Sequence, residues 1–299
     1  MASVAPAVSD AEAAVTLGQV PDTFRQAFLL SRYQLRDYLR SRRFVLMMSI
    51  VAVIGAILTF ILSYYHGSLT VKGLTASSSA FYGSLWSDGV TVVIVFSGII
   101  FGGDAIAGEF QNKTGYFLMG LPIRRASVYA GKFLAAFAAS LVAVIVYLAI
   151  LLANAAYYLH GNAFPLALGE SFVIAILYLL ALLGAVFLFS SMFKNSLYAV
   201  LVVAVLFLFG FSLLQDLIVG LVKIEPWFII TYADQVISYP FLSTLPAHVT
   251  TSTSHGPRGG TITTTVYSPT YPEGLIIMAG YFILTAIAGL FFFEREEFP

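Results

Sequence analysis

The side chains best suited to chemistry lie in one polar stretch, residues 109–132, which reads EFQNKTGYFLMGLPIRRASVYAGK. Within it, the apolar run from Tyr116 to Met119 lies between two glycines and is soon followed by Pro122. Glycine tolerates unusual backbone dihedrals and proline cannot continue a helix, so this run forms a compact tip. Three cations follow the tip: Arg124, Arg125 and Lys132. These residue types favour non-covalent docking into a groove of another protein or, alternatively, packing of the tip back onto its own chain.

Bond-making chemistry is not indicated by any motif of the chain. There are no cysteines, which excludes disulfides and thiolate metal sites. The sequence has neither an HExxH pattern nor a serine in the setting of a nucleophile elbow. The nearest approach to a phosphate-binding loop, Gly115-x4-Gly120, is followed by Leu121 and Pro122 where lysine and Ser/Thr are required. We therefore predict no catalytic residue, no metal site and no cofactor in this chain.

The composition indicates a membrane protein. Of the 299 residues, 59% are hydrophobic and only 10% are charged, and the mean hydropathy is +0.90. A soluble domain carries about 25% charged residues. The net charge of +0 argues against nucleic acid as a partner, because nucleic-acid-binding domains are usually basic. Residues 1–40 lack the apolar core of a signal peptide, so we expect the N-terminus to stay as translated.

A helix needs about 20 apolar residues to cross the hydrocarbon layer, and several segments meet this requirement. The second is the weakest, because Asp88 lies near its start. We predict an all-α polytopic membrane protein with tails at 1–21 and 294–299, a connection at 104–132 and a long connection at 223–273. The six predicted spans are residues 44–65, 81–103, 133–159, 171–193, 197–222 and 274–293.

The Lys/Arg distribution predicts the orientation of these spans. Cytoplasmic flanks are rich in Lys and Arg. With both termini in the cytoplasm, 12 of the 15 Lys/Arg residues fall inside, and only Lys72, Lys223 and Arg258 fall outside. All four histidines then lie at the outer side, which leaves no histidine within the membrane to act as a base or a metal ligand: His66, His160, His248 and His255.

Residues 22–43 precede the first span and form an amphipathic pattern. At about 100° per residue, Phe24, Phe28, Leu35 and Leu39 share one stripe, and arginines gather along its flank. A basic amphipathic helix of this kind lies in the headgroup plane with its arginines on anionic lipid. A simpler interpretation is that the arginines only anchor the cytoplasmic side, and the two readings are compatible.

The long connection at 223–273 contains two Thr-rich runs, His248–Ser254 and Thr261–Tyr267, on either side of a Gly-Pro-Arg-Gly-Gly turn. This arrangement predicts an exposed β-hairpin, with a disordered tether as the alternative. Within the fifth span, Gln215 and Asp216 are candidates for a translocation path or a dimer interface, because ionisable groups at membrane depth are usually functional. Alternatively, Asp216 is simply hydrated at the outer interface.

The polar stretch resembles the cytoplasmic loop of ABC-2-type transporter permeases, including the NosY-like members. Two positions depart from that pattern: Lys113 replaces the usual Gly, and Arg124 stands where Ser or Thr is common. The residues at matching intervals are Asp104, Glu109, Thr114, Phe117, Leu118, Pro122, Arg125, Gly131 and Lys132. The six spans, the N-terminal helix and the long outer connection extend the resemblance over nearly the whole chain.

The resemblance implies the membrane half of an ABC transporter, usually an exporter, with an N-terminal elbow helix and short outer helices before about Pro246. The loop between spans 2 and 3 would form a coupling helix on a separate ATP-binding subunit, which supplies ATP and Mg, and a second permease half would complete the transporter. The implied ATPase contact is Thr114, Gly115, Tyr116, Phe117, Leu118 and Met119. The implied support is Asp104, Glu109, Pro122, Arg125, Gly131 and Lys132, with Glu109 and Arg125 bracing the contact.

Two other functions remain open. An autonomous channel or ion-coupled transporter should have central charges or broken helices, and the six predicted spans have no central Asp, Glu, Lys or Arg and no Pro. A membrane anchor that recruits a soluble complex without transport would look much like the permease. Few polar groups line the spans, so a transported molecule would be lipid-like, hydrophobic or peptidic rather than a small hydrated ion.

Overall fold

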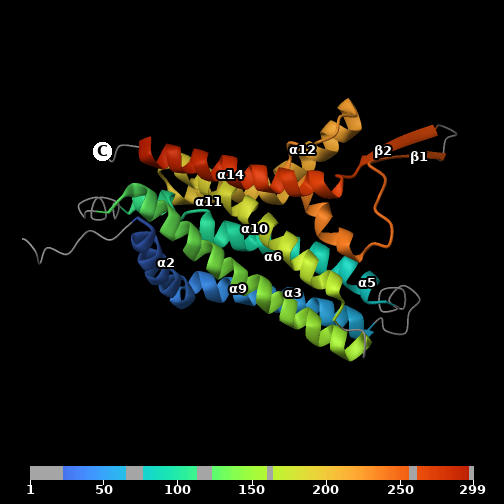
Figure 1. Ribbon diagram of the computed structural model, residues 1–299, viewed down its shortest axis with the longest axis horizontal. Coiled ribbons are helices and arrows are strands. Elements are labelled where there is room, and N and C mark those ends of the chain that lie inside the picture. Colours follow the sequence, from blue (N-terminus) through green and yellow to red (C-terminus); the bar gives the residue numbers. More distant parts are fainter. Residues whose placement is uncertain (1–22, 65–76, 113–122, 160–163, 256–260, 296–299) are drawn as a thin grey trace, which may run out of the picture.

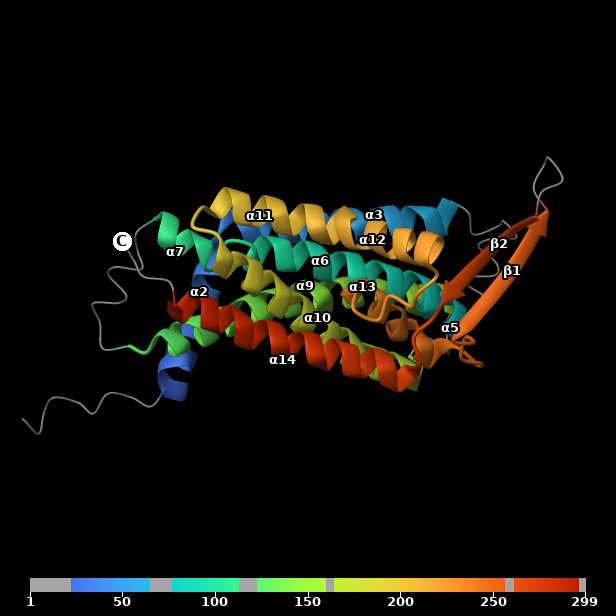
Figure 2. The same cartoon turned by 90° about the horizontal axis from the view of Figure 1, so that it is seen from above.

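The computed structural model describes residues 23–64, 77–112, 123–159, 164–255 and 261–295. Its long helices lie side by side in one bundle (Figures 1 and 2). Six of these helical segments are long and apolar enough to cross a membrane. The predicted all-α, six-span fold is therefore confirmed. We call the end of the bundle where α2 (Thr23–Arg40) lies the elbow end, and the end with strands β1 and β2 the hairpin end.

Two of the six spans, the second and the fifth, contain short π-helical turns within their α-helices. The second span starts with α5 (Ser78–Phe81) and a π-helical turn (Tyr82–Trp86) ahead of α6, and the fifth contains π-helical turns at Leu206–Gly210 and Ile218–Val222. In order, the main helices are α3 (Arg42–Tyr64), α6 (Ser87–Gly102), α9 (Arg125–Leu159), α10 (Leu166–Met192), α11 (Ser196–Val205) continuing into α12 (Phe211–Leu217), and α14 (Tyr271–Arg295).

The N-terminal helix and the first span are separate helices joined at Ser41. The Ser41 hydroxyl donates to the Tyr38 carbonyl oxygen at 2.7 Å and accepts from the Phe44 backbone N–H at 3.3 Å. The side chain thus replaces helical backbone bonds at the bend. The boundary lies close to the one predicted from the amphipathic pattern.

The α6 and α10 helices form the centre of the bundle, whereas α3, α14 and the fifth span are mostly exposed. Gly98 and Gly102 lie where α6 meets α10. A Cβ atom on Gly98 would lie 2.4 Å from Leu182 Cδ2, and one on Gly102 would lie 2.8 Å from Val186 Cγ1. The Gly-x3-Gly pair therefore permits close packing within this chain.

Several spans extend beyond their predicted limits at the elbow end. The third span begins at Arg125 rather than at 133, and the second ends in a turn at residues 103–106 followed by a short helix, α7 (Ala107–Gln111). Arg125, Gly131 and Lys132, which were assigned to a loop, thus lie in a helix. The apolar window excluded them because Lys132 is charged, but its charge is paired inside the protein.

The hairpin end has the elements predicted for the long connection. Short helical segments, α13 (Ile230–Ala233) and a 3-10 stretch (Asp234–Phe241), precede Pro246. Strands β1 (Val249–His255) and β2 (Thr261–Tyr267) pair antiparallel, with Val249 opposite Tyr267. The short helices are fixed to the bundle through Ser171, whose hydroxyl accepts from Trp86 Nε1 at 2.9 Å and donates to the Ile237 carbonyl oxygen at 2.5 Å.

Candidate functional site

The segment between α7 and α9 is only partly described. Thr114, Gly115, Tyr116, Phe117, Leu118, Met119 and Pro122, the predicted ATPase contact and its proline, lie outside the described residues, as does Lys113. The coupling helix expected in this segment therefore stays a prediction. The structure does describe the residues and helices on either side of this segment, and we call them its frame. The predicted supporting residues in this frame are Asp104, Glu109, Arg125, Gly131 and Lys132.

Lys132 connects α9 to the turn after α6. Its Nζ donates to Glu109 Oε1 at 2.5 Å and to the Ala105 carbonyl oxygen at 2.8 Å. The lysine side chain is only 6% exposed, and the Glu109 side chain is 16% exposed. A buried ammonium group is stable only when it is paired and hydrogen-bonded, and both conditions hold here. This ion pair fixes the positions of the two helices that enter and leave the 113–122 segment.

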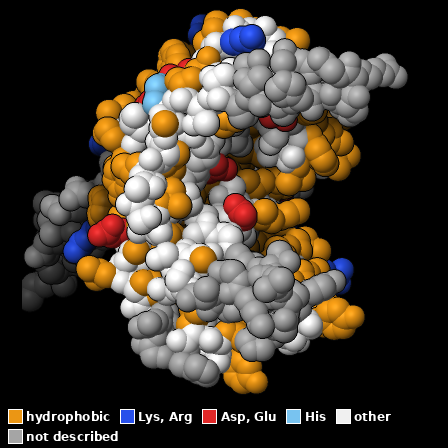
Figure 3. All heavy atoms as spheres, turned by 90° about the vertical axis from the view of Figure 1, so that its right-hand side faces the viewer, with side chains coloured by type: hydrophobic (Ala, Val, Ile, Leu, Met, Phe, Trp, Pro, Cys, Tyr) orange, Lys and Arg blue, Asp and Glu red, His pale blue; other side chains and the backbone are white. Residues whose placement is uncertain are grey.

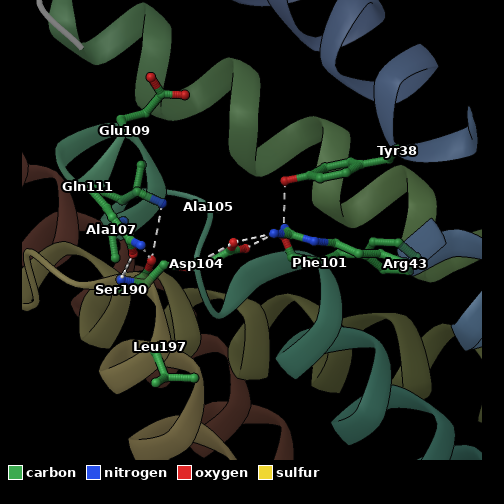
Figure 4. A network of polar contacts seen from close by, with 12 residues as sticks. Tyr38, Arg43, Phe101, Asp104, Ala105, Ala107, Glu109, Gln111, Ser190 and Leu197 are labelled. Atoms are coloured by element: carbon green, nitrogen blue, oxygen red, sulfur yellow. Dashed lines mark hydrogen bonds and ion pairs between the residues drawn. The ribbon is translucent and has the colours of Figure 1, made fainter. Parts of the chain in front are cut away.

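Asp104 lies in the turn and joins the first, second and fifth spans. Both carboxylate oxygens accept from the Arg43 guanidinium, at 2.6 and 2.5 Å (Figure 4). Oδ2 also accepts from the Ser196 hydroxyl, at the start of α11, at 3.0 Å. The bidentate geometry fixes the direction of the arginine as well as its charge. Arg43 is half exposed, so the pair is partly screened by solvent.

Backbone groups of the same turn are satisfied by side chains from other spans. Ser190 of α10 accepts from the Ile106 and Ala107 backbone N–H groups, at 3.1 and 3.2 Å (Figure 4). Tyr38 of α2 donates to the Phe101 carbonyl oxygen at 3.0 Å. Gln111 of α7 accepts from the Ser196 backbone N–H at 2.8 Å, which satisfies a free donor at the start of α11.

The α2 helix packs directly against the start of α9. A Cβ atom on Gly131 would lie 2.9 Å from the Ala27 carbonyl oxygen, so only glycine allows this approach. Arg124 Nη1 donates to Thr23 Oγ1 at 3.0 Å. Arg125 Nη1 donates to the Glu294 carbonyl oxygen at 2.8 Å, near the end of α14.

Glu109 and Arg125 therefore contact different partners. The resemblance to ABC-2-type permeases implied that the two residues brace one contact. In the structure Glu109 pairs with Lys132, and Arg125 fixes the sixth span to the third. The two residues stabilise the same frame from opposite sides.

Together these contacts join the ends of all six spans, and we call this set the elbow-end network: Arg43, Asp104, Glu109, Gln111, Arg125, Lys132, Ser190 and Ser196. Sequence reasoning missed Arg43, Gln111, Ser190 and Ser196 as site residues. Arg43 is 61 positions from Asp104, and Ser196 is 92 positions from it. The only sequence signal was the position of Asp104 itself at the end of an apolar run.

The hairpin end contains the other predicted candidates. A cavity of about 400 Å³ lies between α6, α10, α12 and the short helices, and it is lined by Gln215, Asp216, Tyr178 and Asp234 among others. Gln215 Oε1 accepts from Thr231 Oγ1 at 3.0 Å, while Asp216 is exposed. Figure 3, which looks at this end, shows acidic side chains in its hollow. The cavity is more polar than the sequence analysis expected, because the short helices contribute polar side chains to it.

Asp234 is the most perturbed acid of this cavity. Burial, and second the nearby carboxylate of Asp88, raise its pKa to about 7. The Tyr178 hydroxyl is buried and has no hydrogen-bond partner within the described part of the chain. Polar groups held in this way, without internal partners, are typical of a site that receives another molecule.

Six helices that are long and apolar enough to cross a membrane define a polytopic membrane protein. A family model described as ABC-2 family transporter protein matches residues 30–298. The chain therefore belongs to the ABC-2 transporter family and is a permease subunit of an ABC transporter. None of the curated proteins compared with the chain matches it. The family model does not assign the chain to the NosY-like members, so this subtype stays a prediction.

Proposed function

We propose that this permease exports its substrate across the cell membrane, and that ATP hydrolysis in a separate nucleotide-binding subunit drives the movement. The observation that carries the proposal is the elbow-end network. Both ends of the 113–122 segment are held by groups that reach every span. A force applied to that segment by a docked ATPase would therefore be transmitted to the whole bundle.

The orientation follows from charge. The elbow end carries most of the Lys/Arg residues, so we place it, with both termini, in the cytoplasm. The ATPase, with its ATP and Mg, then docks at Thr114–Met119. The exposed aromatic residues and arginines of α2 face the headgroups of the inner leaflet.

A second permease half would cover the fifth span. No residue of α12 is buried in this chain, although Gln215 and Asp216 lie on it. A helix that is apolar and unburied needs lipid or protein on its surface, and a carboxylate at its outer end favours protein or water. We infer that two permease halves, identical or paralogous, place their α12 helices on either side of the translocation path. The polar cavity then lies at the outer end of that path.

Co-purification tests the proposal. The chain is expressed with ATP-binding subunits encoded in the same genome, solubilised and purified, and the ATPase is measured by stoichiometry and by activity in vesicles. Phe117→Asp and Leu118→Asp should abolish the association while leaving membrane insertion intact, because a buried apolar contact gains a charge. Phe164→Asp, an exposed aromatic residue before α10 at the other end, is the matched control and should keep the ATPase.

Three outcomes would contradict the proposal. A fully coupled ATPase in both loop variants would show that the segment is not the dock. Transport by the chain in vesicles that contain no nucleotide would instead support the channel, and an associated ATPase without any transport would support the anchor.

A further inference from the structure

Three side chains able to ligate a metal converge at the hairpin end, away from the elbow-end network. They are Glu225, just after the fifth span, His248, just before β1, and Glu273, in the first turn of α14. One ligand atom from each lies within 4.8 Å of the other two. The sequence analysis predicted no metal site, because these residues are separated in sequence and show no motif.

The geometry of His248 indicates which nitrogen is free to bind. Nδ1 lies 3.0 Å from the Ser268 carbonyl oxygen, and a carbonyl oxygen only accepts, so Nδ1 carries the hydrogen. In the neutral ring, Nε2 then presents a lone pair, and it lies 3.2 Å from Glu225 Oε2. A lone pair that faces a carboxylate oxygen at this distance requires a proton, on the ring or on the carboxyl group, or a metal ion between the two atoms.

The groups around the three ligands match the surroundings of known metal sites. Metal-binding histidines almost always donate their other N–H to a carbonyl or carboxylate, as His248 does to Ser268. The ligating carboxylates are themselves held by hydrogen bonds. Glu225 Oε1 accepts from the Tyr232 hydroxyl at 2.6 Å, and Glu273 Oε2 accepts from the Thr270 backbone N–H at 3.0 Å.

We propose that Glu225, His248 and Glu273 bind one zinc ion. One imidazole nitrogen and two carboxylate oxygens are a ligand set that zinc accepts, with distances of about 2.0–2.2 Å. Two ligand atoms on a tetrahedral ion of that size are about 3.4 Å apart, close to the 3.2 Å between His248 Nε2 and Glu225 Oε2. Glu273 Oε2 lies 3.9 Å from the other ring nitrogen, Nδ1, so the Glu273 side chain has to rotate to reach the same ion. The fourth position is open to water.

The zinc ion would fasten the hairpin to the ends of two spans. Its ligands come from the ends of the fifth and sixth spans and from the base of the hairpin. The same junction already contains the hydrogen bond from the Tyr267 hydroxyl to the Lys223 carbonyl oxygen, at 2.5 Å. Lys223 itself ends the fifth span with a φ of 54°, the one positive φ among the described non-glycine residues. The ion would thus hold the hairpin beside Gln215 and Asp216, which line a common hollow with Tyr267 of β2.

The test measures zinc on the purified permease. The protein is prepared in detergent without a polyhistidine tag, stripped with EDTA and titrated with Zn²⁺ against a chromophoric chelator. We expect one zinc ion per chain and a higher Tm with zinc than with EDTA. His248→Ala should weaken binding at least tenfold and remove the Tm shift.

Two further variants separate loss of the site from loss of the fold. Glu273→Gln retains a group that can cap α14 but removes the anionic ligand, so its Tm in EDTA should match that of the unchanged protein while zinc binding falls. Glu170→Gln, an exposed carboxylate on α10, should bind zinc normally. Absence of zinc binding by the unchanged protein, or equal binding by His248→Ala, overturns the proposal. Binding of Ca²⁺ but not Zn²⁺ also overturns it.

Discussion

Lys132 is the residue whose chemistry most constrains the elbow end. Its ammonium group is almost removed from water, and it is held by one carboxylate and one carbonyl oxygen. A surface ion pair contributes little to stability, but removal of one partner from a buried pair leaves an uncompensated charge. We therefore expect the Lys132–Glu109 pair to stabilise the start of α9 more than an exposed ion pair would.

The first prediction concerns this pair. Lys132→Met should lower the unfolding free energy by about 3 kcal/mol, because Glu109, whose side chain is only 16% exposed, loses its contact with the Lys132 ammonium group. The double variant Lys132→Met with Glu109→Gln should recover much of that loss. Thermal unfolding of the purified protein in detergent, read by intrinsic fluorescence, measures both. A single variant as stable as the unchanged protein would contradict the burial of the pair.

The second prediction concerns pH and Asp234. Its folded-state pKa is raised from 3.8 to about 7 by burial and by Asp88, so the folded protein binds this proton more tightly than the unfolded chain does. The resulting stabilisation is complete below pH 3.8 and is lost as the pH rises through about 7.

As the pH rises from about 5 to about 8, the Tm of the unchanged protein should fall relative to that of Asp234→Asn. The shift should be several degrees, since about 1 kcal/mol moves Tm by roughly 2–4 °C in a chain of this size. Thermal scans of both proteins at the two pH values measure it. Parallel Tm curves would show that Asp234 titrates normally.

Sequence reasoning identified individual residues better than their partners. Asp104, Glu109 and Lys132 were all named, yet the ion pair between Glu109 and Lys132 was not predicted. A four-residue spacing can be read from one helix, whereas the pairing of α7 with α9 depends on how the chain turns back. The Glu225–His248–Glu273 cluster was missed for the same reason.

At the scale of elements, the glycines decide how closely helices approach. Gly131 brings α2 against α9, and its missing side chain leaves space for the Ala27 carbonyl oxygen. The elbow helix is thus packed on the third span along its length and is more than a membrane-surface anchor.

The third prediction follows from this contact. Gly131→Ala should destabilise the protein by about 1–3 kcal/mol, because the new methyl group would lie 2.9 Å from backbone that must shift. Gly169→Ala in α10 is the matched control, since nothing lies within 4 Å of its Cβ position. That variant should be neutral or more stable, because alanine favours a helix. Equal Tm values for the two variants would contradict the tight approach.

Hydropathy located every span but not every helix end. The third span begins eight residues before its apolar window, at Arg125, because polar residues there bind α2 and α14 rather than water. The β-hairpin was predicted correctly from its Thr-rich runs and its Gly-Pro turn. The hydrogen bond from its Tyr267 to Lys223 at the end of the fifth span was not predicted, because local sequence contains no information about which loops share one end of a bundle.

At the scale of the whole molecule, the absence of cysteine makes orientation directly measurable. Any cysteine introduced into this chain is its only thiol. Ser243, at the hairpin end, and Asn112, at the elbow end, are both exposed.

The fourth prediction uses this property. In intact cells, a membrane-impermeant maleimide should label Ser243→Cys and should label Asn112→Cys only after permeabilisation. The physical reason is the Lys/Arg bias, from which we predict that the elbow end lies in the cytoplasm. The opposite pattern would place the 113–122 segment outside and would rule out an intracellular motor at that position.

The length of α9 has one more consequence. Its 35 residues extend about 52 Å at 1.5 Å per residue, whereas the hydrocarbon layer is about 30 Å thick. Even a tilted helix of this length must project past the lipid tails. A soluble subunit bound at the first turn of α9 would lie outside the bilayer. Its affinity for the permease should therefore not depend on the phospholipid composition of the membrane.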